Sequence, residues 1–174
     1  LATSKGRILA VGDLEDVLAL KGNTTEIVEL NGRALLPGFV GAHTHPVFFT
    51  QGTTQFNVRP GEFRDFDEMI AALKIEATKG DVVAFGYDGS LVKNSRELGF
   101  EVLDQVSTKH SVIVIGLSSH EAYGNHLAFE RAGITEATPD PVGGSLVRDA
   151  SGHLTGAGLE VPGAGLVLKG DKSK

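Results

Sequence analysis

Two histidines one residue apart, His43 and His45, have the residue type and spacing of metal ligands. They follow the apolar pair Phe39–Val40 and precede Pro46, so we expect them at the C-terminal end of a strand. Residues two apart on a strand face the same side, and two imidazoles placed in this way can converge on one ion at about 2.0–2.1 Å. Two ligands do not complete a site, so a chance pair with one ring held by a hydrogen bond is the alternative for the triplet alone.

His120 and Asp88 are polar residues at predicted strand ends, where parallel α/β folds bind ligands. His120 lies between a predicted strand and a predicted helix. There it either contacts substrate or forms a local hydrogen bond at the helix N-terminus. Tyr87 and Asp88 end another strand, and they either point into the same cleft or form a structural turn.

A small antiparallel β module is predicted to position the histidine pair from the N-terminal side. Its strands are expected at residues 7–12, 25–30 and 33–36. Asn31 and Gly32 join the last two strands, because both residue types tolerate the positive φ of a type I′ turn.

Beyond residue 38 the pattern changes to alternating strands and helices. Apolar spacing predicts helices at 66–79 and 119–132, strands at 81–86 and 111–116, and a hairpin over 144–155. Continuous β-branched strands are typical of a parallel sheet. The sequence therefore predicts an α/β fold, either doubly wound or the beginning of a barrel.

Both helices have sequence signals at their ends. Asp65 is the expected N-cap of the first helix and Ser118 that of the second. Gly124 would lie inside the second helix, where it costs on the order of 1 kcal/mol relative to Ala. This cost indicates that another part of the chain approaches the backbone closely there.

The composition narrows the classes of partner and metal site. The 174 residues contain no cysteine, so any metal must be bound by histidine, carboxylate or water. The net charge of −6 does not favour a nucleic-acid or anionic-membrane partner. No apolar segment is long enough to span a membrane. We expect a cytoplasmic protein with neither a nucleic-acid nor a membrane partner.

The residues around the histidine pair, NGRALLPGFVGAHTHP at 31–46, closely resemble the first-strand signature of the amidohydrolase superfamily. The chain from Gly6 to Glu160 is similar to the amidohydrolase family 3 branch. Later motifs that carry this likeness are GYD at 86–88, HEAYGN at 120–125, AGI at 132–134, TPDPVGG at 138–144, RD at 148–149 and TGAGLE at 155–160.

The resemblance implies a composite β-sandwich together with a TIM-type (β/α) barrel that binds one or two divalent metals, with zinc expected. Residues 1–38 would be the β-sandwich part and residues 39–168 an incomplete barrel. The polar residues 169–174 are expected to form a disordered tail.

The resemblance also suggests roles for individual residues. His43 and His45 match the first two metal ligands, and Glu160 falls near a bridging ligand, with an exposed loop carboxylate as the alternative. In such enzymes a metal-activated water attacks the substrate, and a downstream Asp transfers the proton. The implied activity is hydrolysis of non-peptide C–N bonds in small amides or cyclic amides, with the catalytic residues of this chain unknown.

Two departures leave a second hypothesis open. Gly41 replaces the Asp that precedes the histidine pair in the superfamily, and no histidine follows Glu160. The chain is therefore expected to be either the N-terminal part of a metal-dependent hydrolase or a non-catalytic barrel fragment with weak or no metal binding. Exposed strand edges of an incomplete barrel would favour homo-oligomerisation or contact with missing polypeptide.

Overall fold

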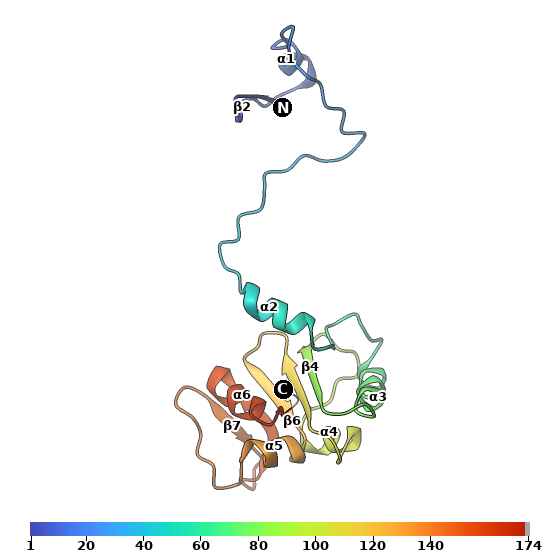
Figure 1. Ribbon diagram of the computed structural model, residues 1–174, viewed down its shortest axis with the longest axis vertical. Coiled ribbons are helices and arrows are strands. Elements are labelled where there is room, and N and C mark those ends of the chain that lie inside the picture. Colours follow the sequence, from blue (N-terminus) through green and yellow to red (C-terminus); the bar gives the residue numbers. More distant parts are fainter. Residues whose placement is uncertain (173–174) are drawn as a thin grey trace. The chain divides into compact units, whose positions relative to one another are not determined.

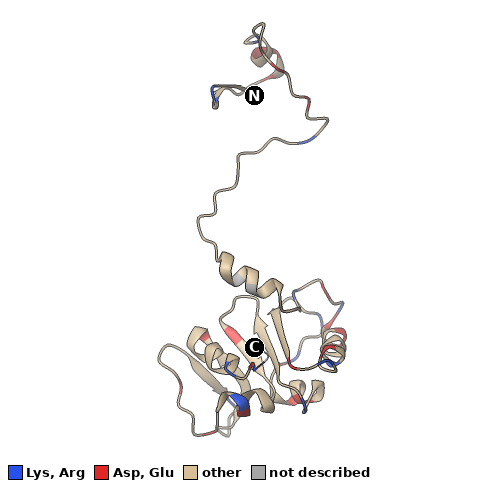
Figure 2. Ribbon diagram, viewed as in Figure 1, with Lys and Arg blue, Asp and Glu red and all other residues tan. Residues whose placement is uncertain are grey.

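The computed structural model describes residues 1–172, and at Phe48 and Gln51 the backbone alone. Contacts within the chain divide it into two compact units, Leu1–His43 and Thr44–Lys174 (Figure 1). Acidic and basic residues are interspersed over the elements of both units (Figure 2).

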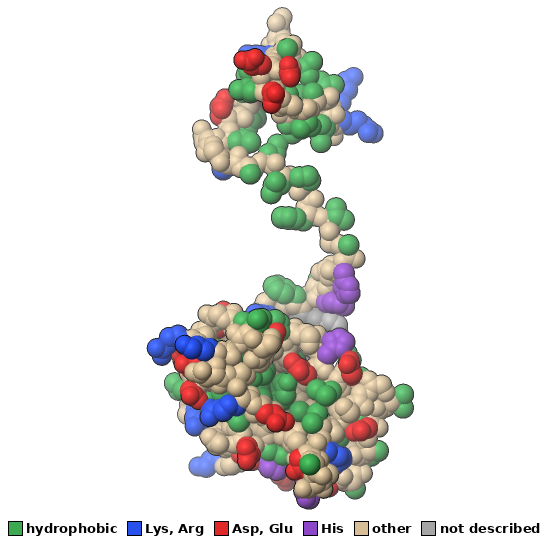
Figure 3. All heavy atoms as spheres, turned by 180° about the vertical axis from the view of Figure 1, so that it is seen from behind, with side chains coloured by type: hydrophobic (Ala, Val, Ile, Leu, Met, Phe, Trp, Pro, Cys, Tyr) green, Lys and Arg blue, Asp and Glu red, His purple; other side chains and the backbone are tan. Residues whose placement is uncertain are grey.

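The first unit contains a β-hairpin and a short helix, which are β1 Ala2–Ser4, β2 Arg7–Ala10 and α1 Leu14–Leu18. The two strands pair antiparallel around Lys5 and Gly6, whose φ angles of 50° and 73° suit a type I′ turn. Many hydrophobic side chains of this unit are exposed (Figure 3). β2 confirms the predicted strand at 7–12. Its partner β1 was not predicted from the sequence.

The second predicted hairpin forms its turn but not its strands. Asn31 and Gly32 have φ angles of 52° and 78°, and the N–H of Arg33 donates to the carbonyl of Leu30 at 3.1 Å. Residues 25–30 and 33–36 are not strands, so the prediction of two strands there was wrong. The apolar side chains Ile27, Val28, Leu35 and Leu36 are all exposed, so burial does not favour pairing of these two segments.

The second unit is built on a six-stranded mixed sheet with the order β3-β4-β5-β6-β8-β7. Its strands are β3 Phe56–Asn57, β4 Val82–Tyr87, β5 Val112–Gly116, β6 Glu121–Gly124, β7 Ser145–Arg148 and β8 Leu154–Leu159. The first three strands are parallel, and the other pairings are antiparallel. The predicted parallel pair β4–β5 and the hairpin β7–β8 are confirmed, in an α/β fold whose larger sheet is mixed.

Helices cover both faces of this sheet. They are α2 Pro46–Thr53, α3 Phe66–Glu76, α4 Phe100–Val106, α5 His126–Ala132 and α6 Glu160–Leu168. The prediction of α3 is confirmed with its N-cap, because the Asp65 carboxylate accepts a hydrogen bond from the N–H of Glu68 at 3.0 Å. The helix ends at Glu76 rather than at residue 79.

The predicted helix at 119–132 is wrong in its first half. Residues Glu121–Gly124 form β6, which pairs antiparallel with β5, and only His126–Ala132 are helical. Ser118 is therefore not the N-cap, and Asn125 takes that position. The close approach expected at Gly124 is confirmed, because a Cβ there would lie 3.1 Å from the Cβ of Ala128.

The helix α6 was not predicted from the sequence, where Glu160 was expected either as a metal ligand or as an exposed loop carboxylate. The expected tail begins directly after α6, and its first residues are ordered, since Gly170 is buried and its carbonyl accepts from the Ser111 hydroxyl at 3.3 Å. Residues 169 and 170 thus belong to the folded unit. Residues 173–174 of the expected tail lie outside the described residues.

The parallel strands β4 and β5 are buried on both faces. On one face Ala84 and Val114 join a core with α3 and α4. On the other, Phe85 and Ile113 join a core with α5 and α6. Figure 1 shows α3 and α6 on opposite sides of β4. Alternating side chains therefore serve two separate cores, as expected for a covered parallel sheet.

Within the described residues, no helix has both the length and the apolar character needed to cross a membrane.

Asn125 is a fully buried polar residue that joins three segments of the second unit. Its side-chain oxygen accepts from the N–H of Val112 at 3.1 Å and from the N–H of Ala128 at 2.9 Å. Its amide nitrogen donates to the carbonyls of Ser107 at 2.7 Å and His110 at 2.9 Å. The residue therefore satisfies four backbone groups that would otherwise lack partners.

We predict that Asn125→Ala lowers the free energy of unfolding by about 2–4 kcal/mol, because buried backbone groups lose their hydrogen bonds without gaining water. Urea unfolding followed by circular dichroism measures this change. The control is Gln105→Ala, which removes an exposed amide on α4 and should change the free energy by no more than about 0.5 kcal/mol. Equal stability of the two variants would contradict the role assigned to Asn125.

Asp81 precedes β4 and forms a second polar link. Its carboxylate accepts from the N–H of Ser111 at 2.9 Å and pairs with the guanidinium of Arg131 at 2.5 Å. Burial alone would raise the pKa of Asp81, but the hydrogen bonds from Ser111 and Arg131 outweigh it and hold the pKa below its ordinary value of 3.8. Ionised Asp81 therefore stabilises the folded state.

We predict that Asp81→Asn is less stable than the unchanged protein at pH 7, and that the difference shrinks as the pH falls. A folded-state pKa below the unfolded one adds stability above the unfolded pKa, and this stability is lost as the pH falls through the folded pKa. Urea unfolding at several pH values between 7 and 3 tests this. The control is Asp67→Asn, whose carboxylate is 75% exposed and pairs with Arg96. A pH-independent difference for Asp81→Asn would count against the assignment.

Candidate functional site

A cleft of about 1100 Å³ lies in the second unit over one face of the sheet. Val83 and Phe85 of β4 and Ile115 of β5 line it with apolar side chains. Residues of α2 and α6 line it as well, among them Phe49 and Ala164. The cleft reaches the carboxyl ends of the parallel strands, which is where open α/β sheets bind their ligands.

His45 lines this cleft, but the strand expected before the histidine pair is absent. Residues 37–45 contain neither helix nor strand, and Pro46 begins α2. Proline favours the first position of a helix, because its ring presets φ and that position needs no N–H donor. The prediction that Pro46 ends a strand carrying the histidine pair was wrong, because Pro46 begins α2 instead.

His43 and His45 fall into different units of the chain. His43 is the last residue of the first unit, and His45 is the second residue of the unit that contains the cleft. In the part of the chain that the structure describes, no three His, Asp or Glu side chains form a group able to hold a metal ion.

His120 and Glu160, two of the residues singled out from the sequence, lie together. The Nδ1 of His120 and the Oε2 of Glu160 are 2.7 Å apart, and each side chain is 60% exposed. His120 lines the cleft from the turn between β5 and β6, rather than from the expected strand-to-helix junction. Glu160 is the first residue of α6.

The backbone is in an unusual conformation at Ser119, which precedes His120, and at Glu160 itself. Ser119 has a φ of 62° and Glu160 a φ of 58°, a region that non-glycine residues seldom occupy. The N–H of His120 also donates to the hydroxyl of Ser118 at 3.2 Å. With Nδ1–H donated to the carboxylate, the Nε2 of His120 would be the ring nitrogen left to accept a proton or hydrogen bond.

Asp88 has a local structural role. Its Oδ1 accepts from the backbone N–H of Ser90 at 3.0 Å and from the Ser90 hydroxyl at 2.6 Å. Tyr87 points elsewhere, with its hydroxyl 2.7 Å from that of Ser95. Among the described residues, neither Asp88 nor Tyr87 is one that lines the cleft. These contacts correspond to the structural turn, the second of the two alternatives.

Arg59 lines the cleft and was not identified from the sequence. It follows β3, and its guanidinium carbon lies 4.9 Å from the centre of the Phe85 ring. Its Nη1 donates to the side-chain oxygen of Asn57 at 3.1 Å. No motif marks this arginine, and β3 has only two residues, so periodicity gave no signal for it either.

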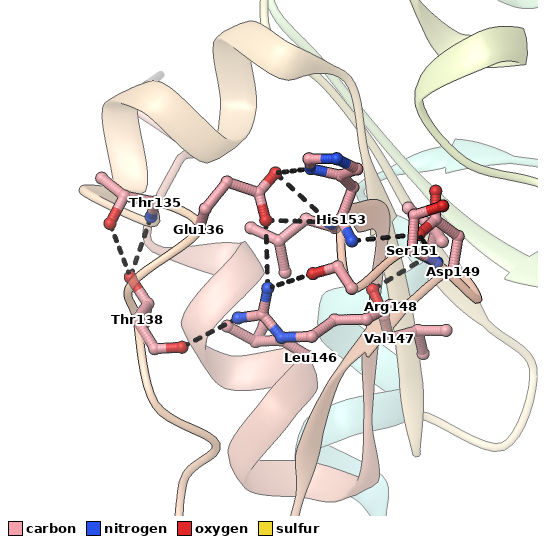
Figure 4. Close-up of polar contacts among 12 residues, drawn as sticks. Thr135, Glu136, Thr138, Leu146, Val147, Arg148, Asp149, Ser151 and His153 are labelled. Carbon is pink, nitrogen blue, oxygen red and sulfur yellow. Dashed lines mark hydrogen bonds and ion pairs between the residues drawn. The ribbon is translucent and has the colours of Figure 1, made fainter.

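Several residues in and around the later sequence motifs, between Thr135 and His153, have structural roles (Figure 4). The Glu136 carboxylate accepts from Arg148 at 3.0 Å and from the N–H of Leu154 at 3.1 Å. Arg148 also donates to the carbonyl of Thr138 at 3.1 Å. Asp149 accepts the N–H of His153 at 3.0 Å within the β7–β8 turn. These contacts attach the loop before β7 to the hairpin.

Comparison with known proteins connects these features to a family. The sequence profile described as the amidohydrolase family matches residues 26–173. The chain is 29% identical over 157 residues to Protein LONG AFTER FAR-RED 3 of Arabidopsis thaliana, covering 90% of this chain and 27% of that protein. It is 27% identical over 161 residues to the N-substituted formamide deformylase of Arthrobacter pascens, covering 90% of this chain and 30% of that enzyme.

A solved structure is also similar in part. An uncharacterized metal-dependent hydrolase from Pyrococcus horikoshii superposes with a TM-score of 0.47 at 20% identity, covering 97% of this chain and 30% of that chain. The chain spans less than a third of the length of each of these relatives. Because the family profile matches most of its residues, including both histidines of the pair, this chain belongs to the amidohydrolase family.

Proposed function

We propose that this chain forms part of a metal-dependent hydrolase that cleaves non-peptide C–N bonds in small amides or cyclic amides. The observation that carries the proposal is the family match across the histidine pair. The similarity to an N-substituted formamide deformylase supports the choice of C–N bond. The remaining ligands and the catalytic Asp would come from polypeptide that is not present among these 174 residues.

The metal proposed is zinc, with His43 and His45 as its first two ligands. Histidine nitrogen suits zinc, and the absence of cysteine leaves histidine and carboxylate as the side-chain donors. The chemistry of this donor set fits the metal, although two ligands alone do not complete a site. A bound divalent metal supplies hydroxide near neutral pH by lowering the pKa of water.

The cleft is proposed as the place where the substrate lies. Val83, Phe85 and Ile115 exclude water from its apolar wall, which strengthens polar interactions inside. His120 is proposed to contact the substrate through Nε2, while its Nδ1 is held by Glu160. Asp88 is proposed to fix the loop that follows β4, through the hydrogen bonds it accepts from Ser90.

Glu160 has two proposed uses, of which the structure favours one. As a metal ligand its carboxylate would have to bind through Oε1 or leave His120, since Oε2 lies 2.7 Å from Nδ1. As a positioning residue it keeps His120 in one tautomer and one orientation. We propose the positioning role for the chain in this conformation.

The larger architecture is part of the same proposal. Strands β3–β5 with α3 and α4 would correspond to part of a barrel wall, with residues 39–168 in the barrel and residues 1–38 in a β-sandwich. A cytoplasmic location is also proposed. Homo-oligomerisation would cover the short edge strand β3, because such edges are otherwise free to pair.

We predict that the purified chain binds zinc, and that His43→Ala and His45→Ala each weaken the affinity more than about tenfold. Removing even an indirect partner of a metal ligand costs about 10–100-fold, so removing a direct ligand should cost at least as much. Zinc content after dialysis against a zinc buffer measures the change. His153→Ala, which alters a 71% exposed histidine on the β7–β8 hairpin, is the matched control. Equal zinc content in all four proteins would refute the ligand assignment.

We also predict that Glu160→Ala shifts His120 from the Nδ1–H towards the Nε2–H tautomer, because the acceptor of the Nδ1 proton is removed. The ¹⁵N chemical shifts of the His120 ring report the tautomer. Glu160→Gln retains an oxygen acceptor and should retain the Nδ1–H form. Loss of zinc in Glu160→Gln without a change of tautomer would instead favour the ligand role.

A further inference from the structure

Arg59 lies at the carboxyl-end side of the parallel strands, where the cleft is lined by uncharged polar side chains and histidine. The guanidinium is held in place on two sides. The Phe85 ring lies 4.9 Å from its central carbon, and the oxygen of Asn57 accepts from its Nη1 at 3.1 Å. The neighbouring polar lining residues on this side are Thr54, Gln55, Ser118, Ser119 and His120. The arginine is therefore oriented before any ligand binds.

Three acidic residues line the cleft, Glu76, Asp81 and Asp171, and the first two have cationic partners. Asp81 pairs with Arg131 at 2.5 Å, and Glu76 pairs with Lys79 at 2.6 Å. Across the described part of the chain, the ion pairs of the structure do not include Arg59. Arg59 therefore lines the cleft with a charge that no carboxylate among the described residues pairs with.

An arginine of this kind is suited to an anionic ligand. The guanidinium is always charged and presents N–H groups in a planar fork that matches a carboxylate. One of its nitrogens is used by Asn57, and the others are left for a ligand. The apolar wall formed by Val83, Phe85 and Ile115 lowers the local dielectric, which strengthens such a charge pair.

We propose that Arg59 binds a carboxylate of the substrate, so that the preferred substrates are N-acyl or cyclic-amide compounds that carry a free carboxylate group. The inference rests on the proposed function for the reaction at the amide, while the binding of the carboxylate is testable without turnover. Arg59 then sets substrate specificity, and the apolar wall receives the rest of the molecule.

The test is binding of N-acetyl-leucine and of N-acetyl-leucine amide to the metal-free 174-residue chain, measured by isothermal titration calorimetry. The two probes differ only in the presence of the carboxylate. The unchanged chain should bind the acid about tenfold or more tightly than the amide, as expected for a charge-assisted hydrogen bond. Equal affinity for the two probes, or no binding of either, would overturn the proposal.

Three variants make the test specific. Arg59→Met should bind both probes equally, and Arg59→Lys should keep part of the preference. Arg64→Met removes the same charge from an 86% exposed arginine outside the cleft and should leave the preference unchanged. A preference retained in Arg59→Met, or lost to the same degree in Arg64→Met, would refute the assignment.

The Arg59→Met variant is expected to fold. The Asn57 oxygen also accepts from the backbone N–H of Arg59 at 3.2 Å, so it keeps a partner after the substitution. Methionine preserves apolar contact with Phe85. Circular dichroism checks the fold, and zinc content equal to that of the unchanged chain separates loss of carboxylate binding from failure of the metal proposal.

Discussion

Burial of the parallel strands β4 and β5 on both faces is the constraint on which the second unit depends. Strands enclosed in this way must be apolar at consecutive positions, because alternate side chains enter different cores. The side chains on one face pack against α3 and α4, and those on the other face pack against α5 and α6. Polar groups are therefore confined to the strand ends. There Asp81 joins the amino end of β4 to its neighbours, and Arg59 and His120 reach the cleft from the carboxyl side.

This constraint also explains how much of the fold could be predicted from the sequence. The runs that became β4 and β5, and the capped amphipathic helix α3, are strong local signals, and they were predicted correctly. β6 was mistaken for helix because Ser118 and Glu121 have the spacing of a capping box, although its buried positions, Ala122 and Gly124, alternate as in a strand. Its strand conformation is decided by pairing with β5, which is a tertiary contact. The same holds for α6, whose Gly163 lies against the backbone of Ser145.

The candidate site was predictable only in part. Residue type and family likeness identified His45, His120 and Glu160, but not the contact between the last two, which lie 40 positions apart. The strand expected before His45 did not form. Strand formation depends on packing against neighbouring segments, and these residues have few such contacts. Arg59 has no motif around it, and its importance depends on the ring of Phe85 and on the distribution of charges around the cleft.

The turn at Asn31 and Gly32 has a consequence for the order in which structure forms. The left-handed conformations of both residues are already present, and Arg33 already donates to Leu30 while the flanking segments are unpaired. The formed turn has therefore already lost much of the conformational entropy that closing a hairpin requires. If residues 25–30 and 33–36 later meet an apolar surface, they can pair from the turn outward in a single register, with no search among alternatives. The turn thus fixes in advance which residues of the two segments would face each other.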